Sequence, residues 1–475
     1  MASLQLSASV FDPLARRVAA RLHEAGFQSV FAGGCVRDAL LGRAPKDTDI
    51  ATNATPDEVA RVYPGARFIG KAFGVTLVSE GGRYFEVATF RQDISYSDGR
   101  RPDVVKFAGA EADAHRRDFT INGLFYEPST STILDFVGGC DDVQRRIVRA
   151  IGDAERRFEE DHLRLLRAVR FANTLNFTIA PETFSAIKKL APKINRISPE
   201  RIFTELTRIW VESKQPGKAL EMLRETGLLA ETLPEVLAMA GVEQPPQFHP
   251  EGDAFTHTAL ALDQLKSPDA KLAWAVLLHD VGKPPTYTEE KTAEGVRIHF
   301  HGHAGVGSQM ADEILRRLRA SNEFREAVVH SVKNHMRFID WPNMKQATRR
   351  KIVAHPLFPM DIELHRADCL ASNGALETHQ AALKEYERLQ NEVTLPRAWV
   401  TGHDLMKLGV PEGPTIALWR QRAFDAQLEN KFANRADLLA WLAEAIRAEF
   451  PEKETGSDSA SPTPPRQDPS ADSST

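Results

Sequence analysis

The spacing of apolar residues changes near residue 150 and divides the chain into two kinds of region. Before this point, short β-rich runs alternate with brief helical stretches. QSVFAGG predicts a strand that ends in glycines, and CVRDALLG predicts a helix that stops at Gly42. Two alternating runs in GVTLVSEGGRYFEVATFR flank Glu80-Gly81-Gly82 and predict a β-hairpin. The later part is helical almost throughout. We therefore predict an α+β fold, in which a small head with a mixed sheet and helices precedes all-α regions.

The helical part begins with two predicted amphipathic helices. In RFEEDHLRLLRAVRFANTL, the residues Leu163, Leu166, Val169 and Phe171 follow a period close to 3.6, which predicts a helix through this stretch. RISPERIFTELTRIW predicts a second helix, with Ser198 as its cap. The Pro- and Gln-rich stretch GVEQPPQFHPEGD then separates these helices from another helical region, which is rich in histidine.

The last segment, PEKETGSDSASPTPPRQDPSADSST, lacks large aliphatic and aromatic side chains, so we expect a disordered tail. The boundaries that follow from these breaks are a head at 1–150, a helical neck at 151–240, a histidine-rich helical domain at 241–390, a helical C-terminal segment at 391–450 and the tail at 451–475.

Composition excludes several classes of protein. The chain has 475 residues, 42% of them hydrophobic and 26% charged, as in ordinary globular proteins with more than one domain. No apolar run approaches the roughly 18 residues that a membrane span needs, and the first residues do not resemble a secretory signal. Three widely separated cysteines without a CxxC pair argue against a disulfide framework or a cysteine zinc site. We expect a cytoplasmic protein without a membrane partner.

The net charge of −5 does not by itself suggest a nucleic-acid partner. The tail carries five acids and two bases, so the rest of the chain has a net charge of −2. Any surface for nucleic acid must therefore be a local basic patch.

Candidate chemistry begins at a pair of glycines. Gly33 and Gly34 stand where the first predicted strand turns into a helix, so a phosphate can approach bare backbone there. Arg37 lies in the first turn of that helix and can add a charge-assisted contact. A Gly-Gly pair before a helix is more often a simple turn, so this feature needs support from its neighbours.

A pair of aspartates in KDTDI suggests a metal site. If this stretch is a strand, Asp47 and Asp49 project to the same side, about 6.6 Å apart. Such a pair suits two-metal phosphoryl transfer. A calcium-binding EF-hand is excluded, because Ala51 stands at its fifth position and Thr52 where it needs glycine. A solvated acidic turn remains the alternative.

A third acid, Glu86, lies on a later predicted strand between the apolar residues Phe85 and Val87. Pairing of the strands can bring Glu86 beside the two aspartates. An exposed acid on the wet face of the sheet is the alternative interpretation.

Five motifs follow one another in a specific order: FAGGCVRD, KDTDI, RRDFTIN, DFVGGCDD and EEDHLRLLRAVRF. This ordered set resembles the nucleotidyltransferase head of the tRNA nucleotidyltransferase family, which contains CCA-adding enzymes and related bacterial poly(A) polymerases. The resemblance implies a polymerase-β-like head in which Asp47 and Asp49 hold Mg²⁺ and Glu86 is the third catalytic acid. It also implies a set of nucleotide-binding residues: Gly34, Arg37, Arg116, Arg117, Asp161, Arg164, Arg167 and Arg170.

Asp161 and Arg164 can account for base selection. They stand three residues apart on a predicted helix and would share one face. An acceptor beside a donor matches the exocyclic amine and ring-nitrogen acceptor of cytosine and adenine, but not uracil or guanine. Arg167 and Arg170 continue this face and can bind phosphate. An ion pair on a wet helix is the alternative.

The segment ISYSDGRRP, residues 94–102, is similar to the flexible loop of CCA-adding enzymes, although a surface turn would have the same composition. It favours addition of the full CCA sequence to tRNA from CTP and ATP, with release of pyrophosphate. A poly(A) polymerase or a partial (A- or CC-only) adding enzyme is the alternative. A non-catalytic RNA-binding protein with a structural histidine-rich region is an alternative of another class.

The histidine-rich region contains a His-Asp dipeptide after an apolar helix, in KLAWAVLLHD, and resembles the HD phosphohydrolase superfamily. The resemblance implies metal ligands at His257, His279, Asp280 and Asp368, with His303 and His335 as further ligands or phosphate contacts. Ni, Mn, Fe or Co is compatible with these ligand types. Such a site would use a metal-bound water to hydrolyse phosphoesters. Nearby histidines remain alternative partners: His299, His301, His330 and His365.

WVTGHDLMKLGVPEGPTIALW, residues 399–419, resembles the C-terminal piece of HD-bearing family members. It predicts two short helices around a Gly/Pro turn that contact the tRNA elbow, with a plain helical tail as the alternative. A monomer and a homodimer are both compatible with the sequence.

Overall fold

The computed structural model describes residues 6–96, 102–245, 249–293, 295–390 and 395–450. The chain forms two compact units. The first consists of Met1–Ile339 and Leu357–Leu383, and the second of Asp340–Pro356 and Lys384–Thr475. The predicted disordered tail and the DGR part of the predicted flexible loop lie outside the described residues, so both remain predictions.

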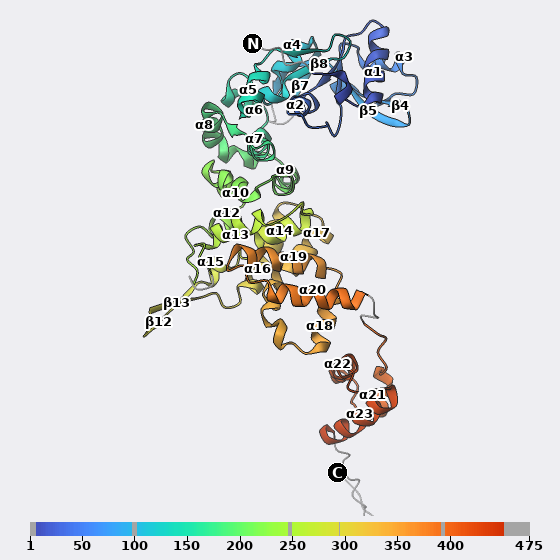
Figure 1. Ribbon diagram of the computed structural model, residues 1–475, viewed down its shortest axis with the longest axis vertical. Helices are drawn as coiled ribbons and strands as arrows, with labels where there is room; N and C mark the ends of the chain where they lie inside the picture. Colours follow the sequence, from blue (N-terminus) through green and yellow to red (C-terminus); the bar gives the residue numbers. More distant parts are fainter. Residues whose placement is uncertain (1–5, 97–101, 246–248, 294, 391–394, 451–475) are drawn as a thin grey trace, which may run out of the picture. The chain divides into compact units, whose positions relative to one another are not determined.

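The head is built on a mixed seven-stranded sheet, as predicted (Figure 1). In spatial order its strands are β3 (Arg67–Gly70), β4 (Val75–Glu80), β5 (Arg83–Thr89), β2 (Ile50–Thr52), β1 (Ser29–Ala32), β8 (Leu124–Glu127) and β9 (Thr132–Asp135). β2 is parallel to β5, whereas β1 is antiparallel to both β2 and β8. The predicted hairpin is β4–β5, and the separate strands β6 (Arg91–Tyr96) and β7 (Pro102–Phe107) form a two-stranded arm.

Alternation along β1 supplies the two cores of the head. Phe31 is buried in the larger hydrophobic cluster together with residues of α1 (Pro13–Glu24). Its neighbours Val30 and Ala32 lie in a smaller cluster with residues of α4 (Ala110–His115). This alternation follows from the two-residue period of a strand, and it places helices against both faces of the sheet. Three further helices complete the head: α2 (Gly34–Leu40), α3 (Pro56–Val62) and α5 (Gly139–Arg145).

The neck is helical, as predicted, but the first predicted helix is broken. α6 (Ala154–Glu160) ends before Asp161, whose backbone is extended, and α7 (Leu163–Leu175) begins two residues later. The neck continues through α8 (Pro181–Leu190), α9 (Pro199–Glu212), α10 (Pro216–Glu225), α11 (Leu228–Thr232) and α12 (Pro234–Leu237). A short parallel pair, β10 (Ile147–Val148) and β11 (Thr178–Ile179), joins its start to the end of α7.

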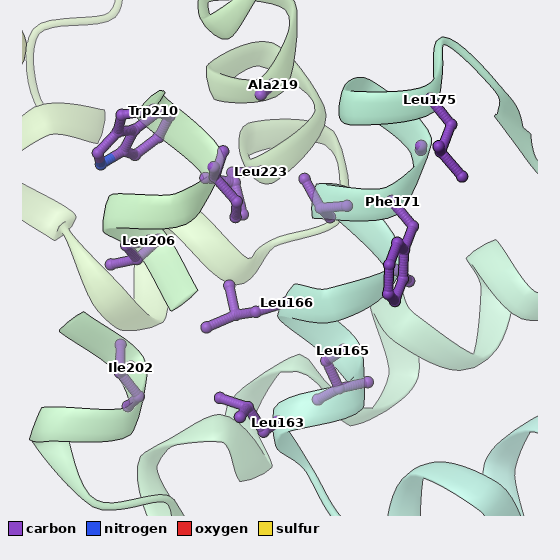
Figure 2. Packing of buried hydrophobic residues seen from close by; sticks show 14 of the residues in the cluster. Leu163, Leu165, Leu166, Phe171, Leu175, Ile202, Leu206, Trp210, Ala219 and Leu223 are labelled. Carbon is purple, nitrogen blue, oxygen red and sulfur yellow. The ribbon is translucent and has the colours of Figure 1, made fainter. Parts of the chain in front are cut away.

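Figure 2 shows the packing of this neck. Leu163 and Leu166 of α7, Leu206 and Trp210 of α9, and Leu223 of α10 lie in one buried cluster. Each of α7 and α9 has apolar residues on one side at helical spacing, so the two helices bury these sides against each other. The packing fixes α9 against the helix that follows Asp161.

The histidine-rich domain is mostly helical. Its helices are α13 (Ala254–Asp263), α14 (Ala270–Leu278), α15 (Lys283–Thr286), α16 (His303–Arg317), α17 (Asn322–Asn334), α19 (Phe358–Ala371) and α20 (Glu377–Gln390). The hairpin of β12 (Thr288–Thr292) and β13 (Gly295–His299) is a difference from the helical prediction. Its residues are largely exposed, so it lacks the apolar alternation by which a strand is usually found.

The second unit contains α18 (Gln346–Val353), α21 (Gly402–Lys407), α22 (Pro414–Leu428) and α23 (Arg435–Glu449). α21 and α22 are the two helices predicted around the Gly/Pro turn. Together with α23, these helices form a small core that includes Leu405, Trp419 and Leu442.

Two predicted absences can be compared with the described residues. The three cysteines, Cys35, Cys140 and Cys369, are free thiols. Among the described segments, we find no helix with the length and apolar character needed to cross a membrane.

Candidate active site and metal cluster

An open hollow with a volume of about 990 Å³ lies between the head and the neck, and we call it the head hollow. It brings together ten of the eleven residues predicted for nucleotidyl transfer: Gly34, Arg37, Asp47, Asp49, Arg116, Arg117, Asp161, Arg164, Arg167 and Arg170. Four of the five motifs of the sequence thus meet at one place, and DFVGGCDD does not line the hollow. Glu86 does not line the hollow.

The glycine turn at the head hollow permits a close approach of an arginine. Gly33 has a φ of 74°, a conformation that side chains disfavour, and a Cβ atom there would lie 2.8 Å from Nη1 of Arg117. Its backbone nitrogen donates to the carbonyl oxygen of Leu124, at 2.8 Å, and this bond ties the turn to β8. A glycine at this position is therefore explained by space as well as by backbone conformation.

Asp47 and Asp49 precede β2 and do not lie within it, so the predicted strand placement is wrong for both. The backbone of Asp49 is still fixed, because its carbonyl oxygen accepts a hydrogen bond from Ala32. Desolvation raises the pKa of Asp49, Arg117 opposes this effect, and the negative charge of Asp47 adds to it. A divalent cation between the carboxylates would favour their charged forms, so this pair fits a magnesium site.

Glu86 lies on β5, next to Val87, which pairs with Ile50 in the parallel β2–β5 ladder. Continuing that register brings Glu86 level with Asp49. Val87 and Ile50 are both buried, so alternation places Glu86 on the opposite, exposed side of the sheet. The predicted proximity of Glu86 to the aspartates stays a prediction, because Glu86 does not line the hollow that contains Asp47 and Asp49.

Two buried aspartates orient arginines at the head hollow. One carboxylate oxygen of Asp113 accepts from Nε of Arg116 at 2.8 Å, and the other accepts from Nη2 of Arg117 at 3.0 Å. Burial raises the pKa of Asp113, but the two arginines outweigh it and the resulting pKa is lowered. Asp113 was not predicted from the sequence. Its role depends on contacts with Arg116 and Arg117, which the sequence pattern does not show.

Asp118 plays a similar part for Arg167, which donates from Nε at 2.8 Å and from Nη2 at 2.6 Å. Burial would raise the pKa of Asp118, yet Arg167 and a hydrogen bond from Asn122 hold it well below its usual range. Asn122 in turn accepts from Nη1 of Arg37 at 2.6 Å. Asp118 and Asn122 were not predicted as site residues. The only indication in the sequence is that both belong to the RRDFTIN motif, one of the five ordered motifs.

The predicted helical pairing of Asp161 with Arg164 is wrong, because the helix is broken between them. Arg164 donates from Nη1 to Oε2 of Glu160 at 2.7 Å and to the carbonyl oxygen of Arg157 at 2.8 Å. Asp161 instead accepts from Arg201, with Nη2 of the arginine 2.9 Å from Oδ2. Both side chains still line the head hollow, but each is held by a partner of its own.

Arg170 is buried and paired within the neck. Its Nε lies 2.5 Å from Oε1 of Glu205, and its Nη1 lies 3.2 Å from Oε2 of Glu212. The charge of Arg170 is thus matched by two acids of α9. This ion pairing holds α7 to α9 beside the hollow.

The second site is a buried cluster in the histidine-rich domain, centred on Asp280. Oδ2 of Asp280 lies 3.1 Å from Nε2 of His279 and 3.7 Å from Nε2 of His257. Oδ1 lies 3.6 Å from Nε2 of His303 and 3.8 Å from Nε2 of His335. Two groups with the spacing of metal ligands therefore share one carboxylate.

Asp368 closes the first of these groups, since its Oδ1 lies 3.0 Å from Nε2 of His257. All six predicted residues of this site thus meet in one cluster: His257, His279, Asp280, His303, His335 and Asp368.

The four histidines of the cluster are held in one orientation. Nδ1 of His279, His303 and His335 each donates to a backbone carbonyl oxygen, at 2.7, 3.0 and 2.7 Å. Nδ1 of His257 lies 2.6 Å from Oε1 of Glu251. These bonds leave every Nε2 for the centre of the cluster, which is the arrangement that metal-binding histidines require.

Burial and neighbouring charges shift the pKa values of two histidines of the cluster in opposite directions. Burial lowers the pKa of His257, but hydrogen bonds to Asp368 and Glu251 outweigh this and raise it to about 9. Burial, with His279 as the next contributor, lowers the pKa of His335 to about 4. The donor set of imidazoles and carboxylates fits a site for divalent metal ions.

The alternative histidines have other neighbours. His299 pairs with Glu290 across the β12–β13 hairpin and stacks on His301, with ring centroids 5.1 Å apart. His365 stacks on Phe338. His330 lies 3.4 Å from Asp361. None of these contacts joins the Asp280 cluster.

Lys283 and Glu251 are further members of this site that the prediction did not include as ligands. Nζ of Lys283 lies 2.6 Å from Oδ2 of Asp280 and 2.5 Å from Oε1 of Gln244. Glu251 contacts His257 from the side away from Asp280. Nothing in the spacing of the sequence distinguishes these residues from ordinary surface charges.

Comparison with protein families finds three matching domains in one order. Residues 29–149 match the poly A polymerase head domain, residues 176–239 the probable RNA and SrmB-binding site of polymerase A, and residues 253–372 the HD domain. The predicted boundaries differ from these matched ranges and stay predictions.

Curated relatives have two names. Poly(A) polymerase I of Salmonella typhi is 40% identical over 233 residues, which are 47% of this chain and 50% of the relative. The CCA-adding enzyme of Geobacillus stearothermophilus is 43% identical over 211 residues, which are 44% of this chain and 52% of the relative. The chain thus spans about half the length of the curated relatives it matches.

Solved structures extend the likeness to most of the chain. The Bacillus stearothermophilus CCA-adding enzyme in complex with CTP aligns with a TM-score of 0.70 and 27% identity, over 92% of this chain and 99% of that one. The Thermotoga maritima CCA-adding enzyme complexed with tRNA aligns with a TM-score of 0.57 and 17% identity, over 93% and 98%. The second likeness concerns the fold alone.

Proposed function

Because the chain belongs to the tRNA nucleotidyltransferase family and also carries an HD domain, we propose that it adds CCA to the 3′ end of tRNA from CTP and ATP. The observation that supports this proposal is the head hollow, which is lined by the carboxylates of Asp47 and Asp49, by arginines with acidic partners, and by Asp161 and Arg164. A solved relative of the same fold holds CTP.

In the proposed reaction, the tRNA 3′-hydroxyl attacks the α-phosphate of the nucleotide and pyrophosphate leaves. Asp47 and Asp49 would hold Mg²⁺, which supplies charge neutralisation at the reacting phosphate and activation of the hydroxyl. Glu86, level with Asp49 in the sheet, is the third acid. Arg116 and Arg117 are fixed by Asp113 and can meet the triphosphate without rearranging.

Base selection rests on Asp161 and Arg164. A carboxylate accepts from the exocyclic amine of cytosine or adenine, and a guanidinium donates to the ring nitrogen beside that amine. Uracil and guanine present the opposite pattern, so their edges would form a hydrogen bond with neither side chain. Because protein contacts fix both side chains, they can select C and A without a nucleic-acid template.

The test uses labelled CTP or ATP with three tRNA substrates, which end before the first C, after C and after CC. We expect CTP incorporation on the first two and ATP incorporation on the third. Extension by ATP alone on every substrate would favour a poly(A) polymerase, the name of the Salmonella relative. Asp47→Asn should abolish incorporation. Asp57→Asn removes an exposed head carboxylate that pairs with Lys71, so it serves as the matched control.

For the HD domain we propose a metal-dependent phosphohydrolase. The six-residue cluster supports this activity, because Asp280 belongs to two groups with the spacing of metal ligands, one with His257 and His279 and the other with His303 and His335, which would hold divalent ions. The ions, Ni, Mn, Fe or Co, would supply a bound water of lowered pKa as the nucleophile. Phosphoesters at RNA 3′ ends, including 2′,3′-cyclic phosphates, are the proposed substrates.

This second activity is tested with 2′,3′-cyclic AMP and Ni²⁺ or Mn²⁺. We expect hydrolysis by the natural chain and none by Asp280→Ala. His301→Ala is the control, because it removes an exposed histidine that stacks on His299 outside the cluster. Equal hydrolysis by the natural chain and Asp280→Ala would leave a structural role for the cluster.

A further inference from the structure

Asp161 stands in a break between two helices, where the backbone alone does not fix its side chain. Three contacts do so instead. Oδ1 accepts from the backbone nitrogen of Leu163 at 3.1 Å, and Arg201 donates to both oxygens, from Nη1 at 3.3 Å and from Nη2 at 2.9 Å. The carboxylate plane of Asp161 is therefore set mainly by the fork of one arginine.

Arg201 is itself well anchored. It lies in the first turn of α9, and the next residue, Ile202, is buried in the neck core (Figure 2). Leu206 and Trp210 continue the same buried side of α9. The side chains of Arg201 and Asp161 are only 24% and 17% exposed, so water competes weakly for their hydrogen bonds. The helix α9 thus places the planar guanidinium of Arg201 against Asp161, which lies outside any helix.

Arg164 does not depend on this contact. Its guanidinium is held by Glu160 and by backbone carbonyl oxygens of Arg157 and Arg116. The base-reading donor and acceptor are consequently oriented by separate partners. Loss of the Arg201 contact would release Asp161 and leave Arg164 in place.

Resting on the proposed function, we infer that Arg201 is a specificity-determining positioning residue. It holds the Asp161 carboxylate in the plane that accepts a hydrogen bond from the amine of cytosine or adenine. Each carboxylate oxygen has two acceptor sites. Both sites of Oδ1 are used by Leu163 and Arg201, whereas Oδ2 accepts one bond, from Arg201, and keeps its second site for the base. Arg201 itself forms no bond with the substrate and acts through Asp161.

The test compares the natural chain with Arg201→Gln and Arg201→Lys, using steady-state incorporation on tRNA ending before CCA and after CC. Arg208→Gln is the matched control. Arg208 lies on the same helix and lines the same hollow, but it pairs with Glu212 and does not contact Asp161. The measured quantity is the ratio of kcat/KM for CTP to that for UTP, and for ATP to that for GTP.

A sharper probe is the triphosphate of 2-pyrimidinone riboside, which is CTP without its exocyclic amine. For the natural chain, CTP should be preferred over this analogue. Arg201→Gln should reduce that preference about tenfold, because a mobile carboxylate reads the amine less well. Arg201→Lys keeps the charge but not the fork, so it should restore part of the preference. Arg208→Gln should leave the ratio unchanged.

The outcomes separate this inference from the proposed function. If the natural chain incorporates no nucleotide into tRNA, the proposed function fails and the inference with it. If the natural chain adds CCA but Arg201→Gln keeps its selectivity and its preference for the amine, only the inference is overturned. A lower KM for CTP in Arg201→Gln would also overturn it, since Arg201 would then compete with the base for Asp161.

Discussion

The head hollow and the six-residue cluster around Asp280, which we call the HD cluster, both contain acidic and basic side chains. They differ in which side chains are buried. In the hollow, arginines line an open cavity and are oriented from behind by buried acids such as Asp113 and Asp118. In the HD cluster, four histidines and Asp280 are themselves buried, and their Nε2 atoms converge on one carboxylate. The difference matches the proposed ligands. A large nucleotide needs room beside oriented charges, whereas a metal ion needs a small, dry set of donors that are oriented in advance.

The largest expected effect separates the two sites by activity. Asp49→Asn should lower nucleotide incorporation on the order of 10³-fold, because it removes a carboxylate at the reacting phosphate, and it should leave phosphohydrolase activity intact. Asp280→Ala should have the converse effect on both activities. Both assays are run on the same full-length preparations. If either variant lowers both activities equally, the sites are not independent and the comparison fails.

The next prediction concerns the contact behind the HD cluster. Glu251→Gln should weaken metal binding about 10- to 100-fold, because the carboxylate that orients His257 through Nδ1 is lost. Titration with Mn²⁺, followed by hydrolysis and by thermal stability, measures this change. Activity should return at saturating metal. A loss that no metal concentration restores would place Glu251 in the reaction itself.

A matching change behind the head hollow tests stability and its dependence on pH. Asp118→Asn should lower the free energy of unfolding by about 2 kcal/mol at pH 7, because it leaves Arg167 without its anionic partner. The pKa of Asp118 is lowered in the folded state, so its contribution is present above its unfolded pKa and is lost as pH falls through the lowered value. The difference between variant and natural chain should therefore shrink below about pH 4. Urea unfolding at several pH values measures it, and a difference that grows on acidification would contradict the account.

The smallest expected effect comes from an ion pair outside both sites. Lys71→Ala breaks the exposed contact with Asp57, in which both side chains are more than half exposed. Exposed pairs are screened and contribute little, so neither the urea midpoint nor incorporation should change measurably. A clear loss of stability would mean that exposed ion pairs in the head contribute as much to the free energy of unfolding as buried ones.

The sequence predicted which residues act together better than how they are held. The order of five motifs was sufficient to bring Asp47, Arg117 and Asp161 to one hollow, and the His-Asp dipeptide led to the whole HD cluster.

What could not be predicted depends on contacts between distant residues. Arg201 meets Asp161 across 40 positions of the chain, and Asp118 meets Arg167 across 49. Periodicity reports which side of a helix is apolar, but it does not show that a helix stops at Glu160, because the apolar positions on both sides of the break keep the same spacing. For this reason Asp161 and Arg164 were correctly predicted to lie at one site but were assigned the wrong partners.

The two units are interleaved along the chain, and this affects when each site is completed during synthesis. Leu357–Leu383 returns to the first unit after Asp340–Pro356 has entered the second, so neither unit is continuous in the chain. Asp368 leaves the ribosome 88 residues after Asp280. At roughly 5–20 residues per second, this interval lasts on the order of 4 to 18 s. During that time the nascent chain contains His257, His279 and Asp280, and later His303 and His335, but not yet Asp368. A growing chain can thus complete its head hollow well before its HD cluster, and premature termination anywhere between residues 281 and 367 would yield a polypeptide with the first site and without the second.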